Sequence, residues 1–76
     1  MEIQWEEGFT IAVEIQGDEV VLRANREGLR SLAGQFLALA EETPGTHVNY
    51  DAYNSLEDGS SDLVVELIGD AENATL

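Results

Sequence analysis

The fold of this chain is decided by residues 9–24, which read Phe-Thr-Ile-Ala-Val-Glu-Ile-Gln-Gly-Asp-Glu-Val-Val-Leu-Arg-Ala. Over residues 9–16 large apolar side chains alternate with small or polar ones, a period of two that is typical of a half-buried strand. Gly17-Asp18 then supplies a two-residue turn, because glycine readily adopts a positive φ. Residues 19–24 follow as a second strand, so the stretch predicts a β-hairpin.

An amphipathic helix is predicted to follow the hairpin over residues 26–42. Asn25 is a favourable N-cap residue, and Glu27 suits the positive end of the helix dipole. Thr43-Pro44-Gly45 ends the helix. The apolar side chains recur at helical spacing and fall in one sector: Leu29, Leu32, Ala33, Phe36, Leu37, Leu39 and Ala40. The opposite side is expected to face solvent and carries Arg30, Ser31, Gly34, Gln35, Ala38, Glu41 and Glu42.

Further strands are predicted on both sides of these elements. Residues 47–51 alternate again, and residues 62–68 form the last strand. The polar stretch 52–61 between them reads as a loop. A weaker strand is predicted over residues 2–6, where Ile and Trp stand two apart. Residues 70–76 are expected to be a frayed tail.

These elements predict an α+β fold in one domain, residues 1–69, with the order (β)ββαββ. A small antiparallel sheet of four to five strands would carry one amphipathic helix on one face. The length of 76 residues admits a single domain with a small core. The predicted core consists of Phe9, Ile11, Val13, Leu29, Leu32, Phe36 and the last strand.

Charge limits the kinds of partner that the chain can bind. Sixteen acidic residues face three basic ones (Arg23, Arg26 and Arg30), which gives a net charge of -13. Nucleic acid and anionic membranes are unsuitable partners, because binding to phosphates needs Lys and Arg. A basic protein would instead be attracted to this surface. The alternative is that the acidity only keeps the protein soluble or adapts it to a salty cytoplasm.

The sequence gives no sign of export or of a disulfide framework. It begins without the basic and apolar regions of a secretory signal, and no apolar run approaches the ~20 residues that span a bilayer. Cysteine is absent, so there is no thiolate metal site. We therefore expect a soluble, cytoplasmic protein.

Catalysis is not expected. His47 is the only histidine, and its nearest nucleophiles in sequence are Thr46 and Ser55. Neither lies in a Gly-x-Ser-x-Gly turn, and no oxyanion donors are recognisable around them. The chain is therefore predicted not to be an enzyme.

No cofactor is expected, and the acidic loop fits a calcium site poorly. Aligned on Gly59, a helix–loop–helix calcium site would have Leu56 and Val65 at two of its oxygen-ligand positions. A looser cation site through Asp51, Asp58 and Asp62 stays open as an alternative to a plain turn.

A homodimer is a further hypothesis. Ser31, Gly34 and Ala38 are spaced three and four apart on the predicted outward side of the helix. Small side chains there would let a second helix approach closely.

Several segments resemble the small bacterial family called immunity protein 32, which is associated with polymorphic toxin systems. The similarity covers roughly residues 9–68, and the segments that carry it are Asn25-Arg-Glu-Gly28-Leu29, Leu37-Ala-Leu-Ala40, Pro44-Gly45-Thr46-His47, Leu56-Glu-Asp-Gly59-Ser60 and Leu63-Val-Val-Glu66. In that family a second histidine often follows two residues after the one matching His47, and here that position is Asn49. The resemblance implies a protein that binds and neutralises a cognate toxin without catalysis.

The leading hypothesis is therefore an immunity-type protein that binds a basic toxin domain, such as a nuclease, through its acidic surface. The candidate contact residues are His47, Asn49, Asp51, Glu57, Asp58 and Asp62. The second hypothesis is a structural or interaction module whose acidity reflects a high-salt or GC-rich host, since lysine is absent.

Overall fold

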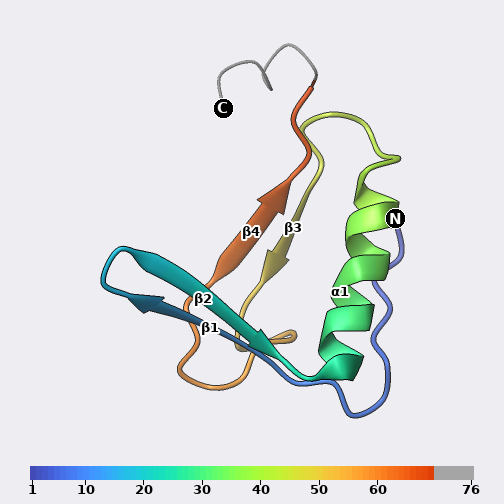
Figure 1. The fold of residues 1–76 in the computed structure, drawn as a ribbon. Coiled ribbons are helices and arrows are strands. Elements are labelled where there is room, and N and C mark those ends of the chain that lie inside the picture. Colours follow the sequence, from blue (N-terminus) through green and yellow to red (C-terminus); the bar gives the residue numbers. More distant parts are fainter. Residues whose placement is uncertain (70–76) are drawn as a thin grey trace.

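The computed structural model describes residues 1–69, so the tail predicted at 70–76 lies outside the described residues. The chain forms an α+β fold with one helix and four strands over this range (Figure 1). The elements are β1 (Ile11–Gln16), β2 (Glu19–Ala24), α1 (Arg26–Leu39), β3 (His47–Tyr50) and β4 (Leu63–Glu66).

The strands form two separate two-stranded antiparallel sheets, β1–β2 and β3–β4. The prediction of one sheet of four to five strands is therefore wrong, and residues 2–6 form no strand. The outer edge of β1 is instead occupied by a loop. Glu57 N donates to Ile11 O and Ser61 N donates to Val13 O, each at 2.8 Å. Because the loop satisfies these backbone groups, no further strand can pair there.

The β1–β2 hairpin and its turn are confirmed. Gln16 pairs with Glu19, so Gly17 and Asp18 alone form the turn. Gly17 has a φ of 61°, whereas no described non-glycine residue has a positive φ. A positive φ at only the first turn residue is characteristic of a type II′ turn, whose twist matches that of the strands.

Helix α1 begins against the start of β1. The Asn25 side-chain oxygen accepts hydrogen bonds from the N–H groups of Gly28 (2.8 Å) and Thr10 (3.0 Å), which confirms Asn25 as the N-cap. Its amide nitrogen donates to Gly8 O at 2.9 Å. Gly28 is buried, and a Cβ at this position would lie 2.6 Å from Thr10 O. The missing side chain therefore lets the helix approach the hairpin.

The helix ends at Leu39, three residues before the predicted end at 42. The N–H groups of Glu41 and Glu42 donate to the carbonyls of Ala38 and Leu39, three residues back. This tighter pattern is common in the last turn of a helix.

The core is smaller than predicted and partly different. The buried apolar residues are Ile11, Val13, Leu32, Leu39, Tyr50 and Leu56. Two predicted core residues are exposed, Leu29 by 53% and Phe36 by 40%. Ser31 and Gln35 are buried instead, although the apolar pattern places both on the outward side. The helix therefore presents a different face to the core, because the N-terminal segment packs against Ser31 and Gln35 by hydrogen bonds.

Two glycines of α1 provide a matched test of this packing. We expect Gly28→Ala to destabilise the protein by about 1–3 kcal/mol, because its Cβ would meet backbone. Gly34→Ala should stabilise it by about 0.5–1 kcal/mol, because a Cβ at Gly34 has no neighbour within 4 Å. Urea unfolding of both variants measures the two effects. Equal stability of the two variants would contradict the close contact at Gly28.

Candidate functional site

The exposed face of the β3–β4 sheet carries two of the predicted contact residues. His47 pairs with Glu66 and Asn49 pairs with Val64, and all four residues are exposed. Val48 and Tyr50 point the other way, toward the core. We call the surface made by His47, Asn49, Val64 and Glu66 the outer face.

Asp51 shapes the loop that follows β3. Its Oδ1 accepts the N–H groups of Tyr53 (2.9 Å) and Asn54 (3.0 Å). Its carbonyl oxygen accepts the N–H groups of Asn54, Ser55 and Leu56. Asn54 Nδ2 also donates to Asn49 O at 3.0 Å. The Asp51 carboxylate is therefore engaged within its own loop.

Residues 57–62 form a loop with a fixed backbone and exposed acids. Leu56 anchors the start of the loop in the core, being only 5% exposed. Ser60 Oγ accepts the N–H of Val13 at 3.1 Å, which adds to the backbone bonds to β1. Glu57, Asp58 and Asp62 are all exposed. Their carboxylates are thus displayed from an anchored backbone.

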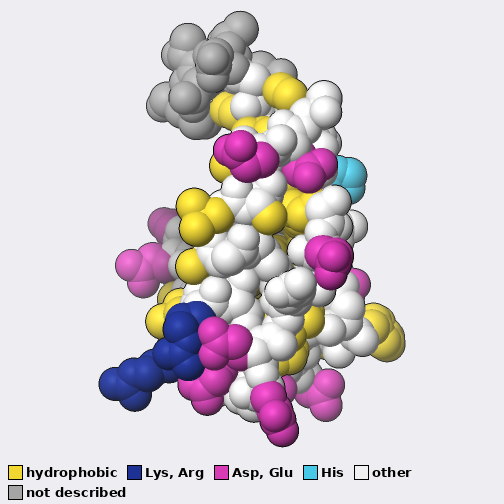
Figure 2. All heavy atoms as spheres, turned by 90° about the vertical axis from the view of Figure 1, so that its right-hand side faces the viewer, with side chains coloured by type: hydrophobic (Ala, Val, Ile, Leu, Met, Phe, Trp, Pro, Cys, Tyr) yellow, Lys and Arg dark blue, Asp and Glu magenta, His cyan; other side chains and the backbone are white. Residues whose placement is uncertain are grey.

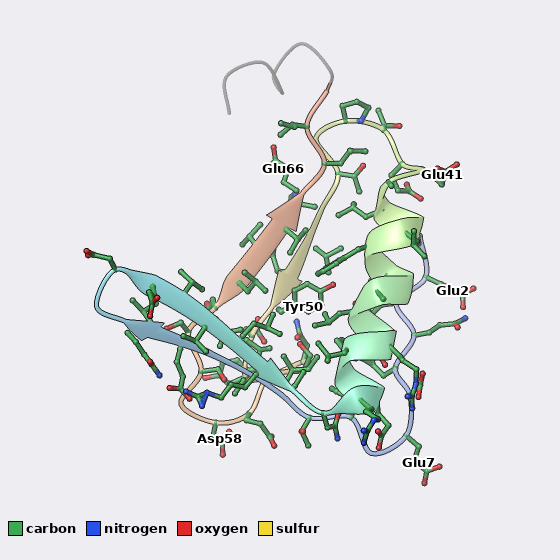
Figure 3. All side chains as sticks on the ribbon, in the orientation of Figure 1. Glu2, Glu7, Glu41, Tyr50, Asp58 and Glu66 are labelled. Carbon is green, nitrogen blue, oxygen red and sulfur yellow. The ribbon has the colours of Figure 1, made fainter. Side chains whose placement is uncertain are left out.

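The predicted contact residues form an extended strip instead of one compact cluster. His47 begins β3, whereas Asp51 follows the end of the same strand. Figure 3 shows Glu66, the neighbour of His47, toward the upper end of the sheet and Asp58 at the bottom of the molecule. A strip of this kind suits contact with a protein surface better than it suits chemistry at one point.

The alternative of a cation site finds no support. Within residues 1–69 no group of three or more His, Asp or Glu side chains is placed to hold a metal ion. Asp51 uses its carboxylate for loop hydrogen bonds, and the other two acids of that hypothesis, Asp58 and Asp62, are exposed.

A buried polar network joins the elements behind this strip. The Tyr50 hydroxyl, on a residue only 1% exposed, donates to Gln35 Oε1 at 2.7 Å. Gln35 Nε2 donates to Gln4 O at 2.8 Å. Figure 3 shows Tyr50 between the sheet and α1. Sequence reasoning missed both residues, because each side chain finds its partner far along the chain. Burial raises the pKa of Tyr50 above its ordinary value.

The N-terminal segment is held against α1 by polar and aromatic contacts. Glu6 N donates to Ser31 Oγ at 2.8 Å, and Arg30 binds both carboxylate oxygens of Glu6. This pair holds the pKa of Glu6 below its ordinary value. Trp5 stacks on Phe9 with ring centroids 4.3 Å apart and meets Tyr50 edge-on at 6.0 Å. Trp5 and Phe9 thereby pack against the buried core residues and enlarge the core.

The small-residue face proposed for a homodimer meets the chain's own N-terminus. Ser31 is buried, and Gly34 and Ala38 line a groove of about 430 Å³ together with Gln4 and Trp5. The N-terminal segment covers this face at Ser31, whereas Gly34 is exposed and a Cβ on it would have no neighbour within 4 Å. A homodimer through this face stays a hypothesis.

The comparisons with known proteins bear on the same region. A family model described as immunity protein 32 matches residues 19–68. The chain belongs to the immunity protein 32 family. The match includes the outer face and the loop at 57–62, whereas β1 and the N-terminal segment precede it. Neither curated proteins nor solved structures gave a match to this immunity protein. Within the described residues, no helix has the length and apolar character to cross a membrane.

The buried tyrosine makes a prediction about stability and pH. A neutral Tyr50 is favoured in the fold, so its contribution is present below the unfolded pKa of about 10 and is lost as pH rises through the raised folded value. Tyr50→Phe should cost about 1–3 kcal/mol at neutral pH, because Gln35 Oε1 loses its donor. It should also reduce the loss of stability above pH ~10. Thermal unfolding from pH 7 to 11 measures both effects.

Tyr53→Phe is the matched control, because Tyr53 is fully exposed. An unchanged stability and pH profile is expected for that variant. If Tyr50→Phe were equally silent, the buried hydrogen bond would not stabilise the fold.

Proposed function

We propose that this immunity protein neutralises a cognate toxin by binding a basic surface of that toxin. The observation that carries the proposal is family membership, together with the net charge of -13. An acidic inhibitor attracts a basic partner over a distance and accelerates encounter. A nuclease is the toxin class that fits best, because an enzyme that grips phosphates carries Lys and Arg at its active site.

The proposed contact surface is the outer face together with the loop of residues 51–62, which joins β3 to β4. His47 and Asn49 supply hydrogen-bonding groups on the outer face, and Glu57, Asp58 and Asp62 supply charge from the loop. Asp51 takes part by holding the loop in shape. Inhibition then follows from covering the toxin's surface, with no chemical step by the inhibitor.

Apolar groups beside these residues favour the same surface. Val64 on the outer face is 56% exposed, and Tyr53 in the adjoining loop is completely exposed. Exposed aromatic side chains are enriched at the centres of protein interfaces, where they bury large areas at a low cost in conformational entropy. A fully exposed tyrosine beside acidic residues is therefore better explained by a binding interface than by a loop that only faces solvent.

Acidic residues cover other faces too, so charge alone does not select the contact surface. Figure 2 shows carboxylates spread down the helix side of the molecule and arginines gathered at its lower left. A test must therefore separate the effect of where the carboxylates lie from the effect of the protein's net charge.

Two triple variants make this separation. Glu57→Gln/Asp58→Asn/Asp62→Asn removes three charges from the loop, and Glu2→Gln/Glu7→Gln/Glu41→Gln removes three exposed charges elsewhere (Figure 3). Each is co-expressed with the toxin encoded beside this gene, and survival is counted. We expect the unaltered protein to rescue growth and the loop variant to lose at least tenfold in rescue, given the usual effect of charges at an interface. The control should lose much less.

Failure of the unaltered protein to rescue growth would contradict the proposed function. Equal loss by both triple variants would contradict the contact surface and leave the function standing.

A salt titration distinguishes the inhibitor from a salt-adapted module. Because most carboxylates are exposed to solvent, the high dielectric constant of water keeps their mutual repulsion weak even without salt. We expect this protein to stay folded when sodium chloride is removed, as followed by far-ultraviolet circular dichroism. Unfolding at low salt would favour salt adaptation as the source of the acidity.

A further inference from the structure

The outer edge of β2 is an open strand edge. The carbonyls of Ile11 and Val13 point outward from β1, where the loop binds them. Because outward groups alternate along an antiparallel pair, those of β2 belong to Val20, Leu22 and Ala24. Within the described residues β2 pairs with β1 only. Its outward N–H and C=O groups are therefore available to another strand.

Apolar side chains are exposed at the same place. Val13 is 1% exposed, but its neighbours on that face of the hairpin, Leu22, Ile15 and Val20, are exposed by 37%, 65% and 67%. The apolar face of the hairpin thus continues beyond the core into solvent, as the arm that projects to the left in Figure 1. A two-stranded arm is marginally stable by itself, whereas additional strands stabilise it.

We propose that this edge pairs with β2 of a second copy of the chain, forming a four-stranded antiparallel sheet across a two-fold axis at Val21. The outward groups of β2 are compatible with this register, in which Val20 of one copy faces the second copy's Leu22. In the same register Glu19 faces the second copy's Arg23 at both ends of the pairing. Opposite charges directly across two strands stabilise them, so the sequence of β2 is complementary to itself.

Charge distribution favours a second copy over the toxin at this edge. Residues 19–30 hold all three arginines of the chain and two acids, a local charge of +1 in a protein of net charge -13. A basic partner is therefore attracted to other, acidic surfaces of the protein. An acidic second copy is repelled least at residues 19–30. Arg23 is also free to pair, because its contact with Glu14 is long, at 3.6 Å, between two exposed side chains.

This pairing leaves the outer face unobstructed. The two-fold axis stands perpendicular to the new sheet, so both helices lie on the same side of it. The outer face belongs to the other sheet, β3–β4, which takes no part in the pairing. The proposal does not depend on what the protein inhibits, and either can fail without the other.

Charge reversal tests the register in the absence of any toxin. Sedimentation equilibrium of the full chain gives the dimer dissociation constant for the unaltered protein, Glu19→Arg, Arg23→Glu and the double variant. Each single change replaces two attractive cross-strand pairs with two repulsive ones and should weaken dimerisation about tenfold. The double variant should restore the original constant, because it exchanges the charges. Circular dichroism confirms that each variant is folded.

Glu19→Arg is the sharpest of these variants, because it lowers the net negative charge. If only overall repulsion mattered, Glu19→Arg would strengthen dimerisation, whereas the register predicts weakening. Arg26→Glu, just outside β2, makes the same charge change as Arg23→Glu and should have a smaller effect.

Three results would overturn the proposal. The protein could be a monomer up to millimolar concentration. It could form a dimer whose dissociation constant does not change when residues 19 and 23 are substituted, or stay a monomer whose β2 edge is bound only when toxin is added. The third result would assign the edge to a strand of the toxin.

Discussion

The side-chain amide of Gln35 connects three parts of the protein that share no strand pairing. From the middle of α1 it accepts the Tyr50 hydroxyl of β3 and donates to the Gln4 carbonyl of the N-terminal segment. Both ends of the amide are satisfied, and no described buried side-chain polar atom lacks a partner. A buried network of this kind specifies one arrangement, because any other packing would leave a polar group without its hydrogen bond.

The network explains why the helix is turned away from its expected orientation. Apolar periodicity alone places Leu29 and Phe36 inward, but the buried face instead includes Ser31 and Gln35. Polar residues at core positions look like solvent-facing residues in a sequence, and their partners lie 25 or more residues away for two of these bonds. Local features were predictable because the residues that form them are close together in sequence. The Gly17 turn and the Asn25 cap depend on neighbours within a few residues.

The division into two sheets was not visible in the sequence, because a loop takes the place of a strand. Residues Glu57 and Ser61 bind the edge of β1 with backbone groups, which any residue type can do. The candidate site shows the same limit. Exposed loop acids could be inferred from composition, whereas the use of the Asp51 carboxylate within its own turn depends on the exact backbone path.

We propose that different surfaces of the protein bind different partners. In this proposal the outer face and the loop at 57–62 bind the toxin, and the arginine-bearing edge of β2 binds a second copy. Hydrogen exchange followed by mass spectrometry, with and without the cognate toxin, tests this assignment most directly. We expect the toxin to slow exchange in residues 47–62 and to leave exchange in residues 19–24 unchanged. Slower exchange confined to residues 19–24, with none at 47–62, would contradict it.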